Sequence, residues 1–191
     1  SYFHKNVGGY SAVKLRRYQE MIDHHFTHEL EEMIGALGRQ QPVDSAFMGL
    51  TALNMLNTKY ILYDLNSPPI QNPQAWGNAW FSPRYRIVAD ADEEIRELDQ
   101  VTTRESVVID KRFAAHLEGK SFPNDSTATI ILTQYHPNYL KYNYKSESEQ
   151  LTVFSEIYYA DGWKAFVDGK ETPHFRANYI LRAMVLPAGE H

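Results

Sequence analysis

The sequence predicts an α+β fold in which N-terminal amphipathic helices and a small mixed sheet pack against a C-terminal antiparallel β-sandwich. Near the N-terminus, apolar residues recur every three or four positions, which is the period of a helix. From residue 127 onward, short apolar segments alternate with turn residues, a pattern typical of antiparallel strands. No repeat, low-complexity segment or flexible linker separates the two patterns. Residues 1–126 and 127–191 are therefore expected to form one continuous unit.

The first element expected is a long amphipathic helix over residues 11–37, which ends at Gly38. A second helix is expected over residues 46–56, with Asp44 or Ser45 as its cap. The apolar face of the first helix consists of Leu15, Tyr18, Ile22, Phe26, Leu30, Met33 and Leu37.

Shorter elements are expected in the middle of the chain. Residues 66–78 contain three prolines and are expected to form an irregular loop. A helix is expected over residues 92–98, because Asp90 can cap it and its acidic first turn suits the positive end of the helix dipole. The strands expected in this part of the chain are residues 59–64, 85–88 and 106–110.

Strands dominate the C-terminal part. Asp168-Gly169 predicts a tight hairpin, because both residue types tolerate positive φ. Pro187-Ala188-Gly189 predicts another turn, after which a strand should return along residues 179–186. Because the sequence stops at His191, we expect that strand to be missing and residues 179–186 to form an exposed edge. The strands expected here are residues 129–133, 140–145, 150–158, 163–167 and 179–186.

Composition limits the classes of function. The chain has 191 residues, of which 43% are hydrophobic and 13% aromatic, so it can bury a sizeable core. A net charge of −5 without a long basic run argues against nucleic acid or an anionic membrane surface as partner. The absence of cysteine excludes disulfides and thiolate metal sites. No apolar segment approaches the ~20 residues needed to span a bilayer.

No set of residues predicts catalysis. The sequence lacks a G-x-S-x-G elbow, a P-loop and a cysteine nucleophile. His24 and His28 have a spacing that can hold a metal, but the sequence marks no third ligand. A solvated helix face, with His25 at the core margin, is therefore the favoured interpretation. No metal and no cofactor are expected, and a metal-dependent hydrolase built on His24 and His28 is the weakest alternative.

The candidate binding residues surround one turn. Tyr158, Tyr159 and Trp163 flank Asp161. A sugar ring can stack on an exposed aromatic face there, and the Asp161 carboxylate can accept hydrogen bonds from sugar hydroxyls. The competing and favoured interpretation is that Trp163 anchors the core of the sandwich.

Four charged or polar residues lie within the apolar strands. Glu156 is expected on the solvent face of its strand, where alternation would place it. Arg176, Asn178 and Arg182 are either sheet-surface groups or buried partners of a backbone corner, and both interpretations stay open.

Several segments resemble the YfhO family of bacterial membrane proteins. They are "GGYSAVKLRRYQEMIDHHF", "LNMLNTKYIL", "NPQAWGNAWF" and "FSEIYYADGWKAFVDGKETPHFRANYILRAMVLPAGEH". The last segment, with its GWK-x-x-x-DGK and RANY-x-x-RA-x-x-x-PAG patterns, is the most specific. The resemblance runs from about residue 2 to residue 191, with a more variable stretch between residues 99 and 126.

The resemblance implies an extracytoplasmic domain, on the outer side of the bacterial cytoplasmic membrane, that a final strand and a transmembrane helix follow. The parent would be a polytopic glycosyltransferase-like protein that uses polyprenyl-phosphate sugars to modify cell-envelope glycopolymers. In that family the acidic catalytic residue lies in an early extracytoplasmic loop, which no part of this chain matches. The implied role is therefore non-catalytic.

The partners that the resemblance implies are the transmembrane part of the parent chain and an envelope glycan or lipid-linked sugar. A stand-alone carbohydrate-binding module, with Tyr158, Tyr159 and Trp163 as its stacking residues, is the alternative.

Overall fold

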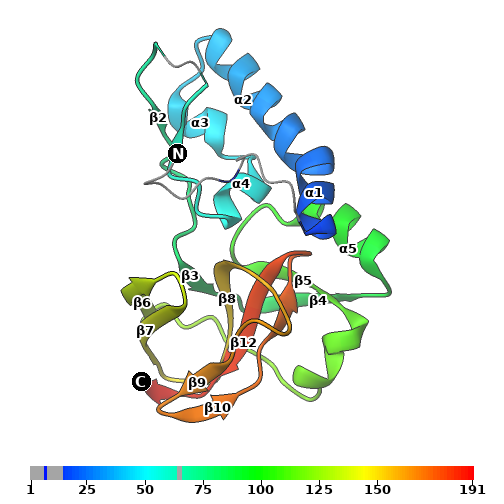
Figure 1. Cartoon of the computed structure of the whole chain (residues 1–191), viewed down its shortest axis with the longest axis vertical. Helices are drawn as coiled ribbons and strands as arrows, with labels where there is room; N and C mark the ends of the chain where they lie inside the picture. The colour runs from blue at the N-terminus through cyan, green and yellow to red at the C-terminus, as the bar shows by residue number, and fades with distance from the viewer. Residues whose placement is uncertain (1–6, 8–14, 64–65) are drawn as a thin grey trace. The chain divides into compact units, whose positions relative to one another are not determined.

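The computed structural model describes residue 7 and residues 15–63 and 66–191. The chain divides into two compact units, an N-terminal unit of residues 1–76 and a C-terminal unit of residues 77–191 (Figure 1). This division lies well upstream of the change of pattern at residue 127. The strand β3 (Ala79–Phe81) pairs with β8 (Gln150–Ile157), so the C-terminal sheets recruit earlier parts of the chain.

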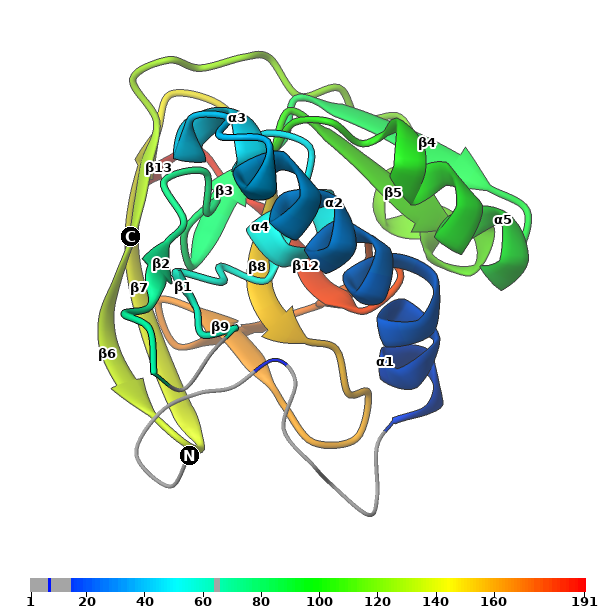
Figure 2. The same ribbon diagram turned by 90° about the horizontal axis from the view of Figure 1, so that it is seen from above.

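A helical segment of three parts runs through the N-terminal unit (Figure 2). It consists of α1 (Arg16–Met21), the π-helical turn η1 (Ile22–Phe26) and α2 (Thr27–Gly38). The predicted helix is thus present from residue 16 onward, while residues 11–14 lie outside the described residues. The π turn was not predicted. The Thr27 N–H donates to the Ile22 carbonyl, which widens this turn of the helix.

The second predicted helix is two short helices, α3 (Val43–Phe47) and α4 (Thr51–Met55). Neither predicted cap is used at α3, because Pro42 occupies its N-cap position and no side chain caps it.

A buried carboxylate from α2 supports the start of α4. The Glu29 carboxylate accepts hydrogen bonds from the backbone N–H of Ala52 at 2.7 Å and of Leu53 at 3.0 Å. These are among the N–H groups that a helix leaves without an internal partner at its first turn. Glu29 therefore satisfies the first turn of α4 and joins α4 to α2.

The predicted strand over residues 59–64 is shorter and more exposed than expected. Within residues 59–63 only β1 (Tyr60–Ile61) forms, and it pairs with β2 (Ile70–Gln71) from the predicted loop, while residue 64 lies outside the described residues. Tyr60 is exposed, whereas Ile61 is buried. Next to this pair, the Asn72 side-chain amide donates to the Asn54 side-chain oxygen at 2.8 Å, which ties the loop to α4.

The C-terminal unit contains several small sheets. A four-stranded antiparallel sheet has the order β11-β12-β8-β3, and a three-stranded antiparallel sheet has the order β13-β7-β6. The strands β9 and β10 form a hairpin, and β4 pairs with β5 in parallel. The bounds are β4 (Arg84–Val88), β5 (Ser106–Asp110), β6 (Thr129–His136), β7 (Tyr139–Ser146), β9 (Ala165–Val167), β10 (Lys170–Thr172), β11 (Phe175–Ala177), β12 (Leu181–Leu186) and β13 (Gly189–Glu190).

The mixed class of the fold and its antiparallel C-terminal sheets are confirmed, but a β-sandwich is not, because the sheets are small and separate. One apolar cluster contains residues from both larger sheets. Tyr144 of β7 and Phe154 of β8 belong to it, together with Met184 and Leu186 of β12. Strands at residues 106–110 and near 150–157 formed close to their predicted bounds.

The prediction that residues 179–186 form an exposed edge is wrong. The strand β12 pairs with β8 along its whole length and with β11 over residues 181–183, and beyond β11 the side chains of Met184 and Leu186 are buried. After Pro187 the chain does not turn back along β12. It crosses instead to the other sheet, where β13 pairs with β7. The turn residues at 187–189 therefore connect two sheets rather than two neighbouring strands.

Local signals around α5 (Ala91–Glu97) were informative. The Asp90 side chain accepts a hydrogen bond from the Glu93 N–H at 2.9 Å, as expected of an N-cap. The helix connects β4 to β5, and a crossover of this kind allows the two strands to run in parallel. The hairpin turn is also confirmed, because Asp168 and Gly169 both have positive φ, at 49° and 80°.

A buried ionic network joins α5, β5 and β11. The Arg176 guanidinium lies 3.1 Å from the Glu94 carboxylate and 3.3 Å from the Asp110 carboxylate. All three side chains are buried, and the guanidinium also lies over the Phe113 ring at 5.2 Å. Charges taken out of water in this way require close partners to offset the cost of desolvation.

The adjoining backbone corner completes this network. The Asn178 backbone N–H donates to the Val108 carbonyl at 2.8 Å, and the Asn178 side-chain oxygen accepts from the Val108 N–H at 2.9 Å. Asn178 and Tyr179 both have positive φ, at 44° and 68°. The Tyr179 N–H donates to Glu94 at 3.1 Å. Of the two interpretations of Arg176 and Asn178, the structure therefore supports buried partners of a backbone corner.

Replacement of Arg176 by Met is expected to lower the free energy of unfolding by about 3–5 kcal/mol, because two buried carboxylates lose their shared cation. Arg86→Met is the matched control. It makes the same substitution at an arginine whose side chain is 58% exposed and pairs with Glu97. It should lower the free energy of unfolding by less than ~1 kcal/mol. Urea unfolding of both variants measures the difference. Equal midpoints would show that the buried network contributes little.

Replacement of Glu29 by Ala is expected to lower the free energy of unfolding by about 1–3 kcal/mol, since two buried N–H groups of α4 lose their acceptor. Glu32→Ala serves as the control, because Glu32 lies on the same helix and pairs with His28 at the surface. Circular dichroism during urea unfolding reports both. If the two variants unfold together, the Glu29 contact is not a stabilising cap.

Candidate glycan-contact surface

The predicted binding residue Trp163 is held by an arginine from β12. The Arg182 guanidinium lies over the Trp163 ring, with its central carbon 4.2 Å from the ring centroid. Its Nε and Nη2 groups both donate to the Ile157 carbonyl, at 3.1 and 3.0 Å. A guanidinium over an indole ring is a favourable cation–π arrangement. Trp163 is half-buried, so one face of its ring packs on Arg182 while the residue keeps contact with solvent.

An irregularity in strand pairing makes this arrangement possible. The pairing of β12 with β8 passes from Leu181–Ile157 directly to Arg182–Phe154, which skips two residues of β8. Bulges of this kind interrupt the ladder of backbone hydrogen bonds and redirect side chains. Here the Ile157 carbonyl accepts the side chain of Arg182.

The charge of Glu156 and the hydroxyl of Tyr142 lie within electrostatic range of Arg182. Burial lowers the pKa of Arg182, and the Glu156 carboxylate opposes this shift. Burial also raises the pKa of Tyr142, and Glu156 raises it further. At neutral pH the cluster therefore contains a cationic arginine and a neutral tyrosine. The Tyr142 hydroxyl is buried and meets no hydrogen-bond partner among the described residues.

Tyr158 is part of the scaffold rather than of an open platform. Its ring meets the Phe113 ring edge-on at 5.9 Å and lies 5.6 Å from the His174 ring. Its backbone N–H donates to the Ile180 carbonyl at 2.7 Å. Burial, and secondly the charge of Arg182, lower the pKa of His174. Tyr158 is thus half-buried and fixed from several sides.

The remaining predicted residues are more accessible. Tyr159 is 51% exposed, and its ring packs closely on the backbone of Gly162, where an added Cβ would lie 2.3 Å from a ring carbon. Asp161 is exposed. The structure therefore leaves Tyr159, Asp161 and part of Trp163 accessible to a ligand. Trp163 is not the fully buried core anchor that the competing interpretation required.

Sequence reasoning missed the residues that surround Trp163. It considered Arg182 and Glu156 separately, and it expected Glu156 on the solvent face. In the structure Glu156 is half-buried, and its charge acts on Arg182 and Tyr142. Opposite charges on two adjacent strands were the available signal. Those charges indicate a cluster around Trp163 only once the pairing of β12 with β8 and its bulge are known.

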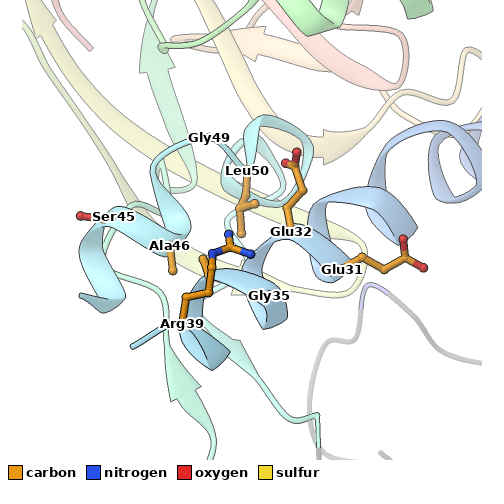
Figure 3. Close-up of a pocket in the computed structure, with 9 residues that line it drawn as sticks. Glu31, Glu32, Gly35, Arg39, Ser45, Ala46, Gly49 and Leu50 are labelled. Carbon is orange, nitrogen blue, oxygen red and sulfur yellow. The ribbon is translucent and has the colours of Figure 1, made fainter. Parts of the chain in front are cut away.

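The N-terminal unit contains a groove of about 320 Å³ between α2 and α3 (Figure 3). Its polar side chains do not converge on one point, since Arg39 extends over the groove while Glu31 points away from it. A catalytic or specific binding pocket requires convergent polar groups, so this groove is not a candidate site. Its lining residues are Glu31, Glu32, Gly35, Ala36, Arg39, Ser45, Ala46, Gly49 and Leu50.

The three histidines of the first helix have different surroundings. His24 is exposed, His28 lies 3.3 Å from Glu32, and His25 is buried. Among residues 7, 15–63 and 66–191, no group of three or more His, Asp or Glu side chains is placed to hold a metal ion.

No protein-family model, curated protein or solved structure matches the chain significantly. The resemblance to the YfhO family therefore stays a prediction. Within the part of the chain that the structure describes, no helix is both long and apolar enough to cross a membrane.

A pH dependence is expected from His174, because its folded-state pKa lies below the ordinary value of 6.5. The folded protein then binds this proton more weakly than the unfolded chain does. Stability should be complete above about pH 6.5 and should decline as pH falls from there through the lowered pKa. Urea unfolding between pH 4 and 8 should show this decline in the wild type and a smaller one in His174→Asn. Identical profiles would contradict the assignment to His174.

Proposed function

We propose that this chain is a non-catalytic, extracytoplasmic domain of a YfhO-like membrane protein, and that it contacts an envelope glycan through the surface formed by Tyr159, Asp161 and Trp163. The observation that carries the proposal is the stacking of Arg182 on Trp163. The resemblance of the sequence supports the cellular setting. We also propose that the two larger sheets of the C-terminal unit act as a small sandwich around their shared apolar cluster.

The stacked arginine orients the tryptophan. Two hydrogen bonds to the Ile157 carbonyl hold the guanidinium, and the guanidinium in turn covers one face of the ring. An aromatic side chain with a fixed orientation loses little conformational entropy when a ligand binds. A sugar ring can then stack on the accessible part of Trp163, and Asp161 can accept hydrogen bonds from its hydroxyl groups.

The chemistry of this surface favours binding over catalysis. Hydrolysis or transfer of a sugar generally uses a pair of carboxylates across the scissile bond. Asp161 is exposed on a turn, and the nearby carboxylate of Glu156 is half-buried and interacts with Arg182. These two groups have different surroundings, and Glu156 already has a cationic partner. We therefore assign the surface to contact with the glycan.

Such a surface should bind a glycan weakly. One stacked ring and a few hydrogen bonds exchanged with water leave little net free energy of binding. We therefore expect a millimolar dissociation constant, which corresponds to a binding free energy of about 4 kcal/mol. In the parent protein, the membrane would keep a lipid-linked substrate nearby and raise its effective concentration. A weak domain would then suffice to position a polymer.

A stand-alone carbohydrate-binding module would use the same three residues. The two functions differ in the chain that surrounds them. Several hydrophobic spans upstream and one downstream in the parent gene favour the membrane protein, whereas a signal peptide alone favours the module.

The binding surface is tested by NMR titration of the chain with envelope glycan fragments. We expect shifts in residues 156–164 that saturate in the millimolar range, and at least a tenfold loss of affinity, about 1.4 kcal/mol, in Trp163→Ala. Phe166→Ala is the matched control, because Phe166 is an aromatic residue that is 55% exposed on the neighbouring β9. It should bind like the wild type.

Two results would remove the proposed surface. One is the absence of shifts in residues 156–164 at saturating sugar. The other is an equal loss of affinity in Trp163→Ala and Phe166→Ala, which would indicate nonspecific contact with exposed aromatic rings.

A further inference from the structure

His191 makes several contacts that the proposed glycan surface does not use. The pairing of β13 with β7 continues through this residue. Its N–H donates to the Tyr144 carbonyl and its carbonyl accepts from the Tyr144 N–H, both at 3.0 Å. The His191 ring also stacks on the Tyr144 ring, with centroids 5.0 Å apart and an angle of 25° between the planes.

Both ring nitrogens of His191 face oxygen atoms that can only accept hydrogen bonds. Nδ1 lies 2.5 Å from a carboxylate oxygen of Asp168, and Nε2 lies 3.2 Å from the carbonyl oxygen of Ala188. A neutral imidazole carries one N–H and can donate to only one of them, whereas an imidazolium carries two. The geometry therefore fits the protonated ring.

We propose that His191 is a pH-dependent clasp, which as an imidazolium fastens β13 to β7 and to the Asp168-Gly169 turn, and which releases β13 when it loses its proton. The turn belongs to the β9–β10 hairpin, so the clasp joins two elements that are not neighbours in one sheet. In Figure 1 the C-terminal end of the chain lies next to this hairpin.

The charged and titratable groups around the ring agree with this assignment. The hydrogen bond to Asp168, followed by that to Ala188, raises the pKa of His191 above the ordinary value of 6.5. Burial, and secondly the charge of Asp168, raise the pKa of Tyr144 to about 12, so this residue stays neutral. In the neighbouring residue pair of β7 and β13, Lys145 Nζ lies 3.7 Å from a carboxylate oxygen of Glu190, so their opposite charges offset each other.

The sign of the effect follows from the raised pKa. The folded protein binds this proton more tightly than the unfolded chain does. The stability that the clasp adds is complete below about pH 6.5, and it is lost as pH rises through the raised pKa of His191. A rise in pH through that pKa therefore releases β13, in the opposite sense to the acid sensitivity expected from His174.

The turn allows a conservative test of the charge. Asp168 has a φ of 49°, and asparagine tolerates this region as well as aspartate does. Asp168→Asn therefore keeps the turn and an acceptor oxygen but removes the negative charge. His191→Gln keeps a polar side chain but removes the titratable ring.

The experiment is NMR on the full 191-residue chain. Ring resonances give the pKa of His191, and amide hydrogen exchange of Tyr144 and His191, corrected for the intrinsic effect of pH, reports release of β13. In the wild type, exchange should accelerate by about tenfold or more as His191 titrates. The pKa should fall in Asp168→Asn, and the accelerated step should vanish in His191→Gln. Amides of β8 should remain protected throughout.

Three results would overturn the clasp. The first is a rate of amide exchange at Tyr144 that does not change as His191 titrates. The second is an unchanged pKa in Asp168→Asn. The third is loss of protection in β8 together with Tyr144, which would show opening of both larger sheets of the C-terminal unit rather than release of β13. In a variant with Gly-Ser added after His191, the C-terminal carboxylate lies farther from the His191 ring. The same titration should be observed in this variant.

Discussion

The C-terminal unit depends on one guanidinium that lies between two buried carboxylates. Arg176 comes from β11, Glu94 from α5 and Asp110 from the end of β5, so a single cation holds three elements together. Removal of these charges from water is costly, and only a close arrangement offsets the cost. The adjoining corner supplies that arrangement. Asn178 pairs with the edge of β5 through both its backbone and its side chain, which fixes the position of Arg176 two residues earlier.

The N-terminal unit uses a related device without a cation. Glu29 accepts two backbone N–H groups at the start of α4, and Glu94 likewise accepts the Tyr179 N–H at the corner. In both units, a carboxylate on a helix satisfies backbone donors from a distant part of the chain. Because buried N–H groups are costly when unpaired, such contacts determine where the distant segment docks. The exposed ion pairs of the surface contribute less to this choice.

Features that depend on residues close in the sequence were predicted correctly. Features that depend on contacts between distant residues were not. The Asp90 cap, the strand at residues 106–110 and the Asp168-Gly169 turn are local, and each is confirmed. The order of strands is not local, so the prediction of an edge at residues 179–186 was wrong. The candidate site shows the same limit. Trp163 was identified from its turn, but its partner Arg182 depends on a bulge that no local pattern indicates.

The proposed glycan surface and the proposed clasp lie at opposite ends of β9, because Trp163 precedes this strand and Asp168 follows it. Whether one affects the other depends on what holds β9 itself. Ala165 and Val167 pack against the apolar cluster of the two larger sheets, and one member of that cluster, Tyr144, also stacks on the His191 ring. Apolar contacts of this kind do not titrate, so they hold the strand at any pH at which the unit is folded. Because the cluster also contains Phe154, Met184 and Leu186, release of β13 as the pH rises should leave β9 packed and Trp163 in place.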